Sequence, residues 1–274
     1  MPVKPGYLLV KPIYVYLGVV EKILYSGYEP LYKPIIPGSS GVVRVLEDPS
    51  NKYGELSGKL AIVSHIGKYG VLGLDEDGLL SNYSSIHPSY IYGYVEEAKP
   101  VHAIYPHIAY SISLGRETSG LTVILGCNLP EIITAYYIKK YKDEEPVILC
   151  SNIPRYLKVG KLKFYRHVSN LPSSCNTIVV GYDKYSLIHE ALSRVSAEKI
   201  IVSIYSRLNI LPVKRGVNTH LLYIDSVDGI EHEILDDIGK YIIRKYLKIV
   251  KAEDIGEIPG LLPPRRMGVV VELR

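Results

Sequence analysis

GLTVILGCNLPEIITAYYIKKY, residues 120–141, is the stretch of this sequence that decides the fold. Residues 121–125 are apolar and rich in β-forming side chains, and Gly126 interrupts the run. From residue 131 to 141 apolar residues recur at roughly helical spacing. This order predicts a strand, a tight turn and a helix, which together begin a parallel β–α–β arrangement.

The turn departs from the pattern that holds a dinucleotide. A Rossmann domain binds pyrophosphate through G-x-G-x-x-G, and here those positions read Gly126, Cys127, Asn128, Leu129, Pro130 and Glu131. Asn128 adds a side chain where the backbone would approach the phosphates. Glu131 puts a carboxylate in the first helical turn, where free N–H groups would bind an anion. We therefore predict a Rossmann-like sheet with weakened dinucleotide chemistry.

Two interpretations of this turn remain open. One is a simple strand-to-helix connection with no ligand. The other is a modified NADP site that uses Gly126 and Asn128, although Glu131 opposes it. In that case Ser151, near the end of the second strand, stands where NAD-preferring proteins carry an acid, and Arg155 could contact a 2′-phosphate. Arg155 could equally be a solvated surface charge.

Strand and helix patterns divide the chain into two parts. Residues 7–20, 41–46 and 59–65 are β-rich and joined by Gly/Pro turns, and they predict a β-rich domain over residues 1–112, built as a partly closed barrel. From residue 113 to 254 strands and helices alternate, which predicts a doubly wound parallel sheet. Residues 255–274 end in a strand expected to complete the first domain. The predicted strands of the sheet are 121–125, 146–150, 163–165, 177–180, 199–205 and 220–224, with helices over 185–195 and 230–247.

Composition excludes several classes of protein. The net charge of +4 is spread over 274 residues, so a nucleic-acid partner is only a minor hypothesis. Residues 155–167, RYLKVGKLKFYRH, resemble a phosphate-contact strip but fit a half-exposed strand better. No apolar run reaches transmembrane length and no signal peptide is evident, so we expect a cytoplasmic protein without membrane contact. The absence of Gln and Trp suggests a thermophilic source.

The three cysteines show no metal-binding spacing. Cys127 and Cys150 follow two strands expected to be neighbours, so they could pair or be reactive, but burial as small apolar side chains is the favoured interpretation. Cys175 precedes its strand and should lie at the opposite edge of the sheet.

Several strings, taken in order, resemble a known family. They are GYLLVK (6–11), PIIPGSSGVVRVLE (34–47), residues 73–83 and the terminal strand 268–273. The chain is similar to the medium-chain dehydrogenase/reductase family, the zinc alcohol-dehydrogenase-like proteins. The resemblance implies a GroES-like β-rich domain beside the Rossmann-like one, and commonly a homodimer joined through the last strand of the sheet, here residues 220–224 (HLLYI).

The metal positions of that family are altered here. The resemblance places Gly18 at the cysteine ligand, Ser39 at the histidine ligand and Ser40 at the neighbouring glutamate. Near the third ligand, around residues 104–107, only His107 could bind a metal. Gly18 and Ser39 cannot replace a thiolate and an imidazole on zinc. We therefore predict no metal site and exclude a zinc-dependent alcohol dehydrogenase.

Polar side chains elsewhere in the first domain could border a cleft between the domains. Tyr16, Ser39 and His107 are conceivable contacts, and Glu21, Ser40 and His65 could join them. Structural histidines are the favoured interpretation, and no residue is predicted to be catalytic.

The favoured function is a divergent relative of these dehydrogenases that has lost zinc and nicotinamide-dependent turnover. Such a pseudoenzyme would act as a binding or structural subunit with an unidentified protein partner and no cofactor. The alternatives are a zinc-independent NADP-dependent oxidoreductase and a nucleic-acid-associated protein.

Overall fold

The computed structural model describes residues 3–27, 34–50, 54–153, 162–206, 220–224, 230–253, 255–262 and 267–273. The chain forms two compact units. Residues 1–107 and 229–274 make the strand-rich unit, and residues 108–228 make the parallel-sheet unit. The expected boundaries at residues 112 and 254 differ from these, and the second differs most. Within the described residues, no helix has both the length and the apolar character needed to cross a bilayer.

The parallel-sheet unit confirms the fold class predicted from residues 120–141. Six strands follow the order β10-β9-β8-β11-β12-β13, and every neighbouring pair is parallel. Their bounds are β8 (Thr122–Leu125), β9 (Val147–Leu149), β10 (Lys163–Tyr165), β11 (Ser174–Val180), β12 (Ser196–Ser203) and β13 (His220–Ile224). The strand order reverses direction between β8 and β11, which makes the carboxyl ends of these two strands the place where such sheets bind ligands.

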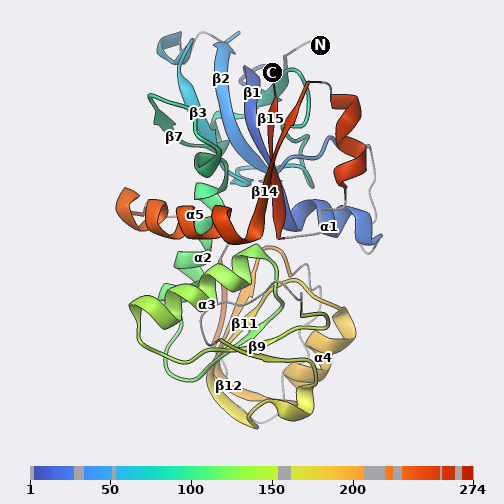
Figure 1. Cartoon of the computed structure of the whole chain (residues 1–274), viewed down its shortest axis with the longest axis vertical. Coiled ribbons are helices and arrows are strands. Elements are labelled where there is room, and N and C mark those ends of the chain that lie inside the picture. The colour runs from blue at the N-terminus through green and yellow to red at the C-terminus, as the bar shows by residue number, and fades with distance from the viewer. Residues whose placement is uncertain are drawn as a thin grey trace. The chain divides into compact units, whose positions relative to one another are not determined.

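The helices of this unit cover both faces of the sheet. Helix α3 (Leu129–Tyr141) follows β8, and α4 (Tyr185–Arg194) follows β11. Because the strand order runs outward in opposite directions from β8 and β11, right-handed crossovers place the two helices on opposite faces. Figure 1 shows them on different sides of the strands. Ile188 and Leu192 of α4 pack with Ile178 and Ile200 of the sheet in one buried cluster.

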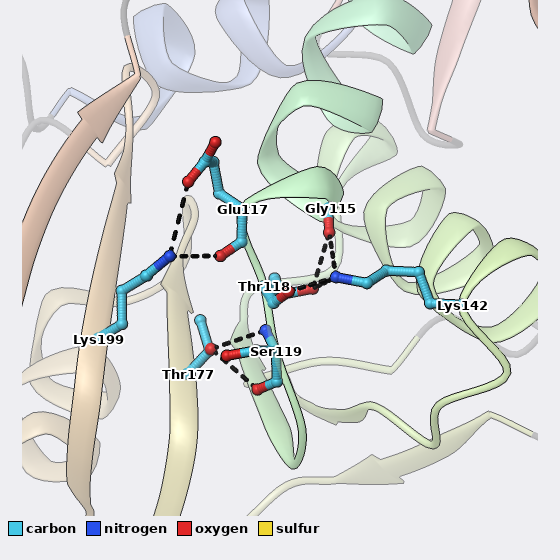
Figure 2. Close-up of polar contacts among 7 residues, drawn as sticks. All are labelled: Gly115, Glu117, Thr118, Ser119, Lys142, Thr177 and Lys199. Atoms are coloured by element: carbon cyan, nitrogen blue, oxygen red, sulfur yellow. Dashed lines mark hydrogen bonds and ion pairs between the residues drawn. The ribbon is translucent and has the colours of Figure 1, made fainter.

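Polar contacts fix the start of β8 (Figure 2). Lys142 Nζ donates to the carbonyl oxygen of Gly115, in the last turn of α2 (Tyr105–Arg116), at 3.2 Å, and to that of Thr118, two residues beyond the helix. Lys199 of β12 donates to the Glu117 carbonyl oxygen at 2.8 Å. The Thr177 hydroxyl of β11 accepts from the Ser119 N–H at 3.2 Å. These contacts hold the connection into β8, whose carboxyl end carries the Gly126 turn.

The strand-rich unit is a largely antiparallel sheet centred on β1 (Leu8–Leu17). The path runs β14-β15-β1-β2-β3-β7, and β6 (Ser84–Ile86) also pairs with β1. The other bounds are β2 (Ser40–Glu47), β3 (Leu60–Val63), β7 (Ile91–Val95), β14 (Leu247–Ala252) and β15 (Gly268–Leu273), with a separate hairpin of β4 (Ile66–Gly67) and β5 (Gly70–Val71). Helices α1 (Val19–Ser26) and α5 (His232–Tyr246) belong to the same unit.

Strand β14 explains why the second boundary between the units differs from the expected one at residue 254. The sequence predicts an amphipathic helix through residue 247, followed by a domain end at residue 254. In the structure α5 ends at Tyr246, and β14 pairs in parallel with β15, for example Ile249 with Val270. The last strand lies in the strand-rich unit, where β15 pairs with β1, for example Val271 with Val15. Residues 229–252 therefore belong to the strand-rich unit.

Candidate functional site

The turn after β8 is the candidate site of the parallel-sheet unit. Gly126 has a φ of +114°, and a Cβ added there would lie 2.9 Å from the Tyr182 carbonyl oxygen. Its N–H donates to the Leu149 carbonyl oxygen of β9 at 2.8 Å. Only glycine fits this left-handed conformation and close approach. The first glycine of the pattern therefore keeps its structural role in the turn.

Glu131 occupies the place where the first turn of α3 would face an anion. Its carboxylate accepts the Asn128 N–H at 2.8 Å and the Tyr182 N–H at 3.1 Å, and the side chain is buried. The pKa of Glu131 is raised to about 7: burial is the main cause and the charge of Asp183 contributes, while hydrogen bonds from backbone N–H groups act in the opposite direction. Glu131 thus satisfies backbone donors that would otherwise be open to a phosphate.

Asn128 is the N-cap residue of α3 and reinforces the same contact. Its backbone is extended, with φ −84° and ψ −176°, so the left-handed conformation open to asparagine is not used. Its side-chain amide donates to the Tyr182 carbonyl oxygen at 2.8 Å. Asn128 and Glu131 therefore both bind Tyr182, in the loop after β11, and join the two strand ends at which a dinucleotide would lie.

Gly181 is a site residue that the sequence analysis missed. A Cβ at this position would lie 2.1 Å from Glu131 Oε1, so the carboxylate packs directly against the Gly181 backbone. The signal was a glycine following the apolar run 177–180, but its partner is 50 residues away in the chain and cannot be identified from local pattern.

Ser151 follows β9, at the position where NAD-preferring proteins carry an acidic side chain. Its N–H donates to Asp183 Oδ2 at 3.0 Å, so a carboxylate from the loop after β11 stands beside this position. Asp183 was not predicted. Arg155, the expected partner of a 2′-phosphate, lies outside the described residues.

Cys127 and Cys150 form a disulfide, with Cα atoms 5.7 Å apart. The favoured interpretation of two buried, inert thiols is wrong, and the pairing held open as an alternative is correct. The physical reason is that β8 and β9 are adjacent and parallel, so the residues just beyond them meet at one edge. Cys175 is buried and free, at the amino end of β11, as predicted.

One group of potential metal ligands occurs among the described residues. Cys127, Cys150 and Asp183 bring their ligand atoms within 4.8 Å of one another. The two sulfurs are bonded to each other, so in this state they offer no thiolate to a cation.

In the strand-rich unit, Tyr16 fills the space beside Gly18. A Cβ on Gly18 would lie 2.0 Å from the Tyr16 hydroxyl oxygen, and one on Gly268 would lie 2.3 Å from the Tyr16 ring. The Tyr16 hydroxyl donates to the Met267 carbonyl oxygen at 2.9 Å. A cysteine cannot stand at position 18 while Tyr16 keeps this position, so the local structure does not fit a zinc ligand there.

Glu21 is the third residue of α1 and holds the adjacent loop. Its carboxylate accepts the Gly18 N–H, which begins α1, and the Gly38 N–H at 2.9 Å. Burial raises the pKa of Glu21, while backbone N–H groups that include that of Ser39 act in the opposite direction. The carboxylate therefore has a structural role at this turn.

The remaining predicted polar residues lie in the interior. Ser40 Oγ donates to the Ala103 carbonyl oxygen at 2.7 Å, and Ser39 is fully buried. The rings of His65 and His107 stack 4.0 Å apart, and Tyr16 meets His107 edge-on. Burial lowers the pKa of His107 to about 3 and the pKa of His65 well below its usual value, so both rings are neutral at pH 7.

Of the six candidate residues, Tyr16, His65 and His107 lie together, and all six are fully buried. Tyr16, Glu21, Ser39, Ser40, His65 and His107 each have 0 % exposed surface. Tyr16 occupies the space that a cysteine side chain at position 18 would need, so this cluster lacks the thiolate with which the resembling family binds catalytic zinc.

No protein-family model matches the chain, and no curated protein sequence matches it. Solved structures do match its fold. The short chain alcohol dehydrogenase rspB of E. coli CFT073, complexed with NADH, is 14 % identical, with a TM-score of 0.69 over 99 % of this chain and 93 % of that chain. S. aureus TarJ in complex with NADPH is 14 % identical, with a TM-score of 0.64 over 100 % of this chain and 94 % of that chain. Bacillus subtilis protein yhfP with NAD bound is 18 % identical, with a TM-score of 0.65 over 99 % of this chain and 92 % of that chain.

These similarities define a class of fold. The chain has the architecture of alcohol dehydrogenase-like proteins, with a Rossmann-type parallel sheet and a strand-rich part. Identities this low speak for the fold alone, because one fold supports many functions. Function therefore has to be argued from the two turns described above.

Proposed function

We propose that this protein has kept a dehydrogenase fold without catalytic zinc or nicotinamide-dependent turnover, and acts as a binding or structural subunit for a protein partner. The observation that carries the proposal is the position of the Glu131 carboxylate, bonded to the N–H groups of Asn128 and Tyr182. In a dinucleotide-binding turn, donors of this kind face the pyrophosphate.

Electrostatics support the proposal. A pyrophosphate entering this turn would have to displace a buried carboxylate that already has two hydrogen bonds, and it would lie near a second carboxylate, Asp183. Like charges in a partly buried site repel strongly because the surroundings screen them poorly. Gly181 packs against Glu131, which leaves the carboxylate in contact with backbone on that side.

The strand-rich unit supports the same conclusion independently. Tyr16 fills the space that a side chain at position 18 would need, and Glu21 takes up the backbone donors at Gly18 and Gly38. The two altered turns lie in different units and use different residues. In both, side chains of this chain fill a place that holds zinc or a dinucleotide in the family it resembles.

A cofactor titration tests the proposal. NADH and NADPH should each give a flat fluorescence titration up to millimolar concentration, and neither should raise the melting temperature, since a ligand that binds only the folded state stabilises it. Metal analysis of the purified protein should find no zinc in stoichiometric amount. Saturable binding followed by turnover of an alcohol, aldehyde or quinone with either cofactor would overturn the proposal.

A second candidate is a zinc-independent oxidoreductase that uses NAD(H) or NADP(H). The observation in its favour is that solved structures of the same fold hold NADH, NADPH and NAD. This candidate predicts saturable enhancement of cofactor fluorescence together with protection from unfolding. The same titration therefore separates the two functions, and a flat result removes the second.

A further inference from the structure

The disulfide links two segments that are distant in sequence. Cys127 lies in the turn between β8 and α3, and Cys150 directly follows β9, with a sequence separation of 23 residues. Both lie at the carboxyl edge of the parallel sheet, where this class of fold places its ligands. The bond therefore ties the Gly126 turn to the end of the neighbouring strand.

The two sulfur-bearing residues differ in exposure. Cys127 is partly exposed, whereas Cys150 is fully buried, at 0 %. A soluble thiol can therefore reach the bond from the side of Cys127. Cys175 is buried and free at the other edge of the sheet, so it offers an internal reference thiol.

We propose that Cys127–Cys150 is a thiol–disulfide exchange site that a dithiol reductant opens in the folded protein, with Cys127 as the sulfur attacked and Cys150 as the leaving thiol. This inference does not depend on whether a dinucleotide binds the turn.

The exchange proceeds in two balanced steps. A thiolate of the reductant attacks Cys127 Sγ, a mixed disulfide forms, and the bond to Cys150 breaks with both bonding electrons on Cys150, which takes up a proton. The second thiolate of the reductant then attacks its own sulfur in the mixed disulfide and releases Cys127, which takes up a proton. The protein gains two electrons and two protons, and the dithiol becomes a disulfide.

Groups around the sulfurs are placed to accommodate the reduced pair. The Asn152 carbonyl oxygen lies 3.5 Å from Cys127 Sγ and 3.7 Å from Cys150 Sγ, so it can accept an S–H donor from either thiol. Cys127 also precedes the N-cap of α3, where the helix terminus favours a thiolate. The negative charges of Glu131 and Asp183 disfavour a thiolate at Cys127. Charge therefore does not decide which sulfur is attacked, and we assign it to Cys127 because that residue is the more exposed.

The turn has other bonds that would survive reduction. Gly126 N–H remains bonded to the Leu149 carbonyl oxygen at 2.8 Å, and the Asn128 side chain to the Tyr182 carbonyl oxygen at 2.8 Å. Because these contacts do not involve sulfur, the parallel-sheet unit keeps its connections at this edge. Reduction is therefore expected without unfolding.

Differential alkylation of the full chain tests the site. Folded wild-type protein treated with dithiothreitol, then trapped with a maleimide and mapped by peptide mass, should show labelling of Cys127 that untreated protein lacks, while labelling of Cys175 is the same with and without dithiothreitol. Oxidised glutathione should restore the disulfide. A bond that resists dithiothreitol in the folded protein and opens only in urea would overturn the proposal, because it would then be a structural cross-link alone.

Two single variants test which sulfur is attacked. Cys150→Ser leaves Cys127, which should form a mixed disulfide with oxidised glutathione at least tenfold faster than Cys150 does in the matched Cys127→Ser variant. Equal rates or the reverse order would contradict the assignment. If either variant fails to fold, the order of alkylation of the two thiols in reduced wild-type protein gives the same comparison.

Discussion

Glu131 accepts a hydrogen bond from the backbone N–H of Tyr182 at 3.1 Å, across a separation of 51 residues in sequence. The contact joins the first turn of α3 to the loop after β11. These are the two places between which a dinucleotide lies in Rossmann-type sheets. In the function proposed above, the carboxylate takes over within the chain a bonding role that a phosphate has in dinucleotide-binding turns.

A similar arrangement occurs in the strand-rich unit. Glu21 is also the third residue of its helix, and it accepts one N–H from the residue before the helix, Gly18, and one from a separate loop, Gly38. In both units a buried glutamate closes a helix start and binds a second segment. In each unit the carboxylate therefore stabilises the turn before a helix.

The Glu131 carboxyl should make stability depend on pH. Its pKa is about 7 in the folded protein against a reference value of 4.5, so the folded state binds the proton more tightly. Its contribution to stability is full below about pH 4.5 and is lost as pH rises through 7, by up to about 3 kcal/mol. Urea unfolding across this range should show the loss in wild type relative to Glu131→Gln.

Comparison with the variant matters because other buried groups also titrate. The raised pKa of Glu21 acts in the same direction, and the lowered pKa values of His65 and His107 act oppositely. The matched control is Glu145→Gln, since Glu145 is exposed and forms a surface ion pair with Lys139. If wild type and Glu131→Gln keep a constant difference from pH 4.5 to 8, the raised pKa is wrong.

Restoring the glycines should open the turn to a dinucleotide. In the double variant Asn128→Gly, Glu131→Gly the six positions regain the G-x-G-x-x-G pattern, and the N–H groups of residues 128 and 182 lose their carboxylate acceptor. We expect NADH affinity at least tenfold above wild type by fluorescence titration, with a stability loss of about 1–3 kcal/mol from the lost bonds. A folded double variant that binds no better would show that these two side chains do not block the site.

Gly18→Ala should destabilise the strand-rich unit. The added Cβ would lie 2.0 Å from the Tyr16 hydroxyl oxygen, so Tyr16 would have to move and lose its bond to Met267. We expect a loss of about 1–3 kcal/mol by chemical denaturation. Gly93→Ala is the matched control, because nothing lies within 4 Å of its Cβ position. Equal stability of the two variants would mean that Tyr16 is not fixed where the structure places it.

Removing the disulfide should lower stability under oxidising conditions. The bond closes a loop of 23 residues, and the double variant Cys127→Ser, Cys150→Ser should lose about 3 kcal/mol of unfolding free energy. In dithiothreitol the difference between wild type and variant should disappear if the folded protein is reducible. A difference that persists after reduction would assign the loss to the serine side chains.

Strand β13 is expected to join two copies of the chain. It pairs with β12 on one side, it is the last strand in the described order of the sheet, and Leu221 is 60 % exposed. An exposed apolar strand of this kind can pair with a second copy. Light scattering at micromolar concentration should give a dimer for wild type and a monomer for Leu221→Lys. Tyr185→Lys, on the exposed side of α4, should remain dimeric, and a monomeric wild type would contradict the expectation.

Local pattern was sufficient for much of the fold. Residues 120–141 predicted β8, the Gly126 turn and α3, because apolar spacing and a glycine break act over a few residues. The alternation that follows predicted the six parallel strands. The strand β14 was missed because its residues directly follow the helix predicted over 230–247, and pairing with the distant β15 makes them a strand.

The candidate sites were predicted less completely. Sequence identified Glu131, Asn128 and the changed positions Gly18 and Ser39 as departures from a pattern. It did not identify the acceptor and donor partners, such as Tyr182 for Glu131 or Gly38 for Glu21, since these are brought together by sheet order across long separations. Sequence placed Cys127 and Cys150 after neighbouring strands, but it could not show that their sulfur atoms meet and form a disulfide.

The sequence by itself determined the kinds of side chain at the two turns: a carboxylate at the third helical position of each, glycine at position 18 and serine at position 39. Tertiary structure decided what those side chains do, because a carboxylate at a helix start can face solvent, a ligand or another segment of the chain. The Glu131 carboxylate packs against Gly181 and accepts a hydrogen bond from Tyr182, so it faces another segment of the chain. The physical reason is that residue chemistry is local, whereas the donors that satisfy a buried charge come from distant parts of the chain.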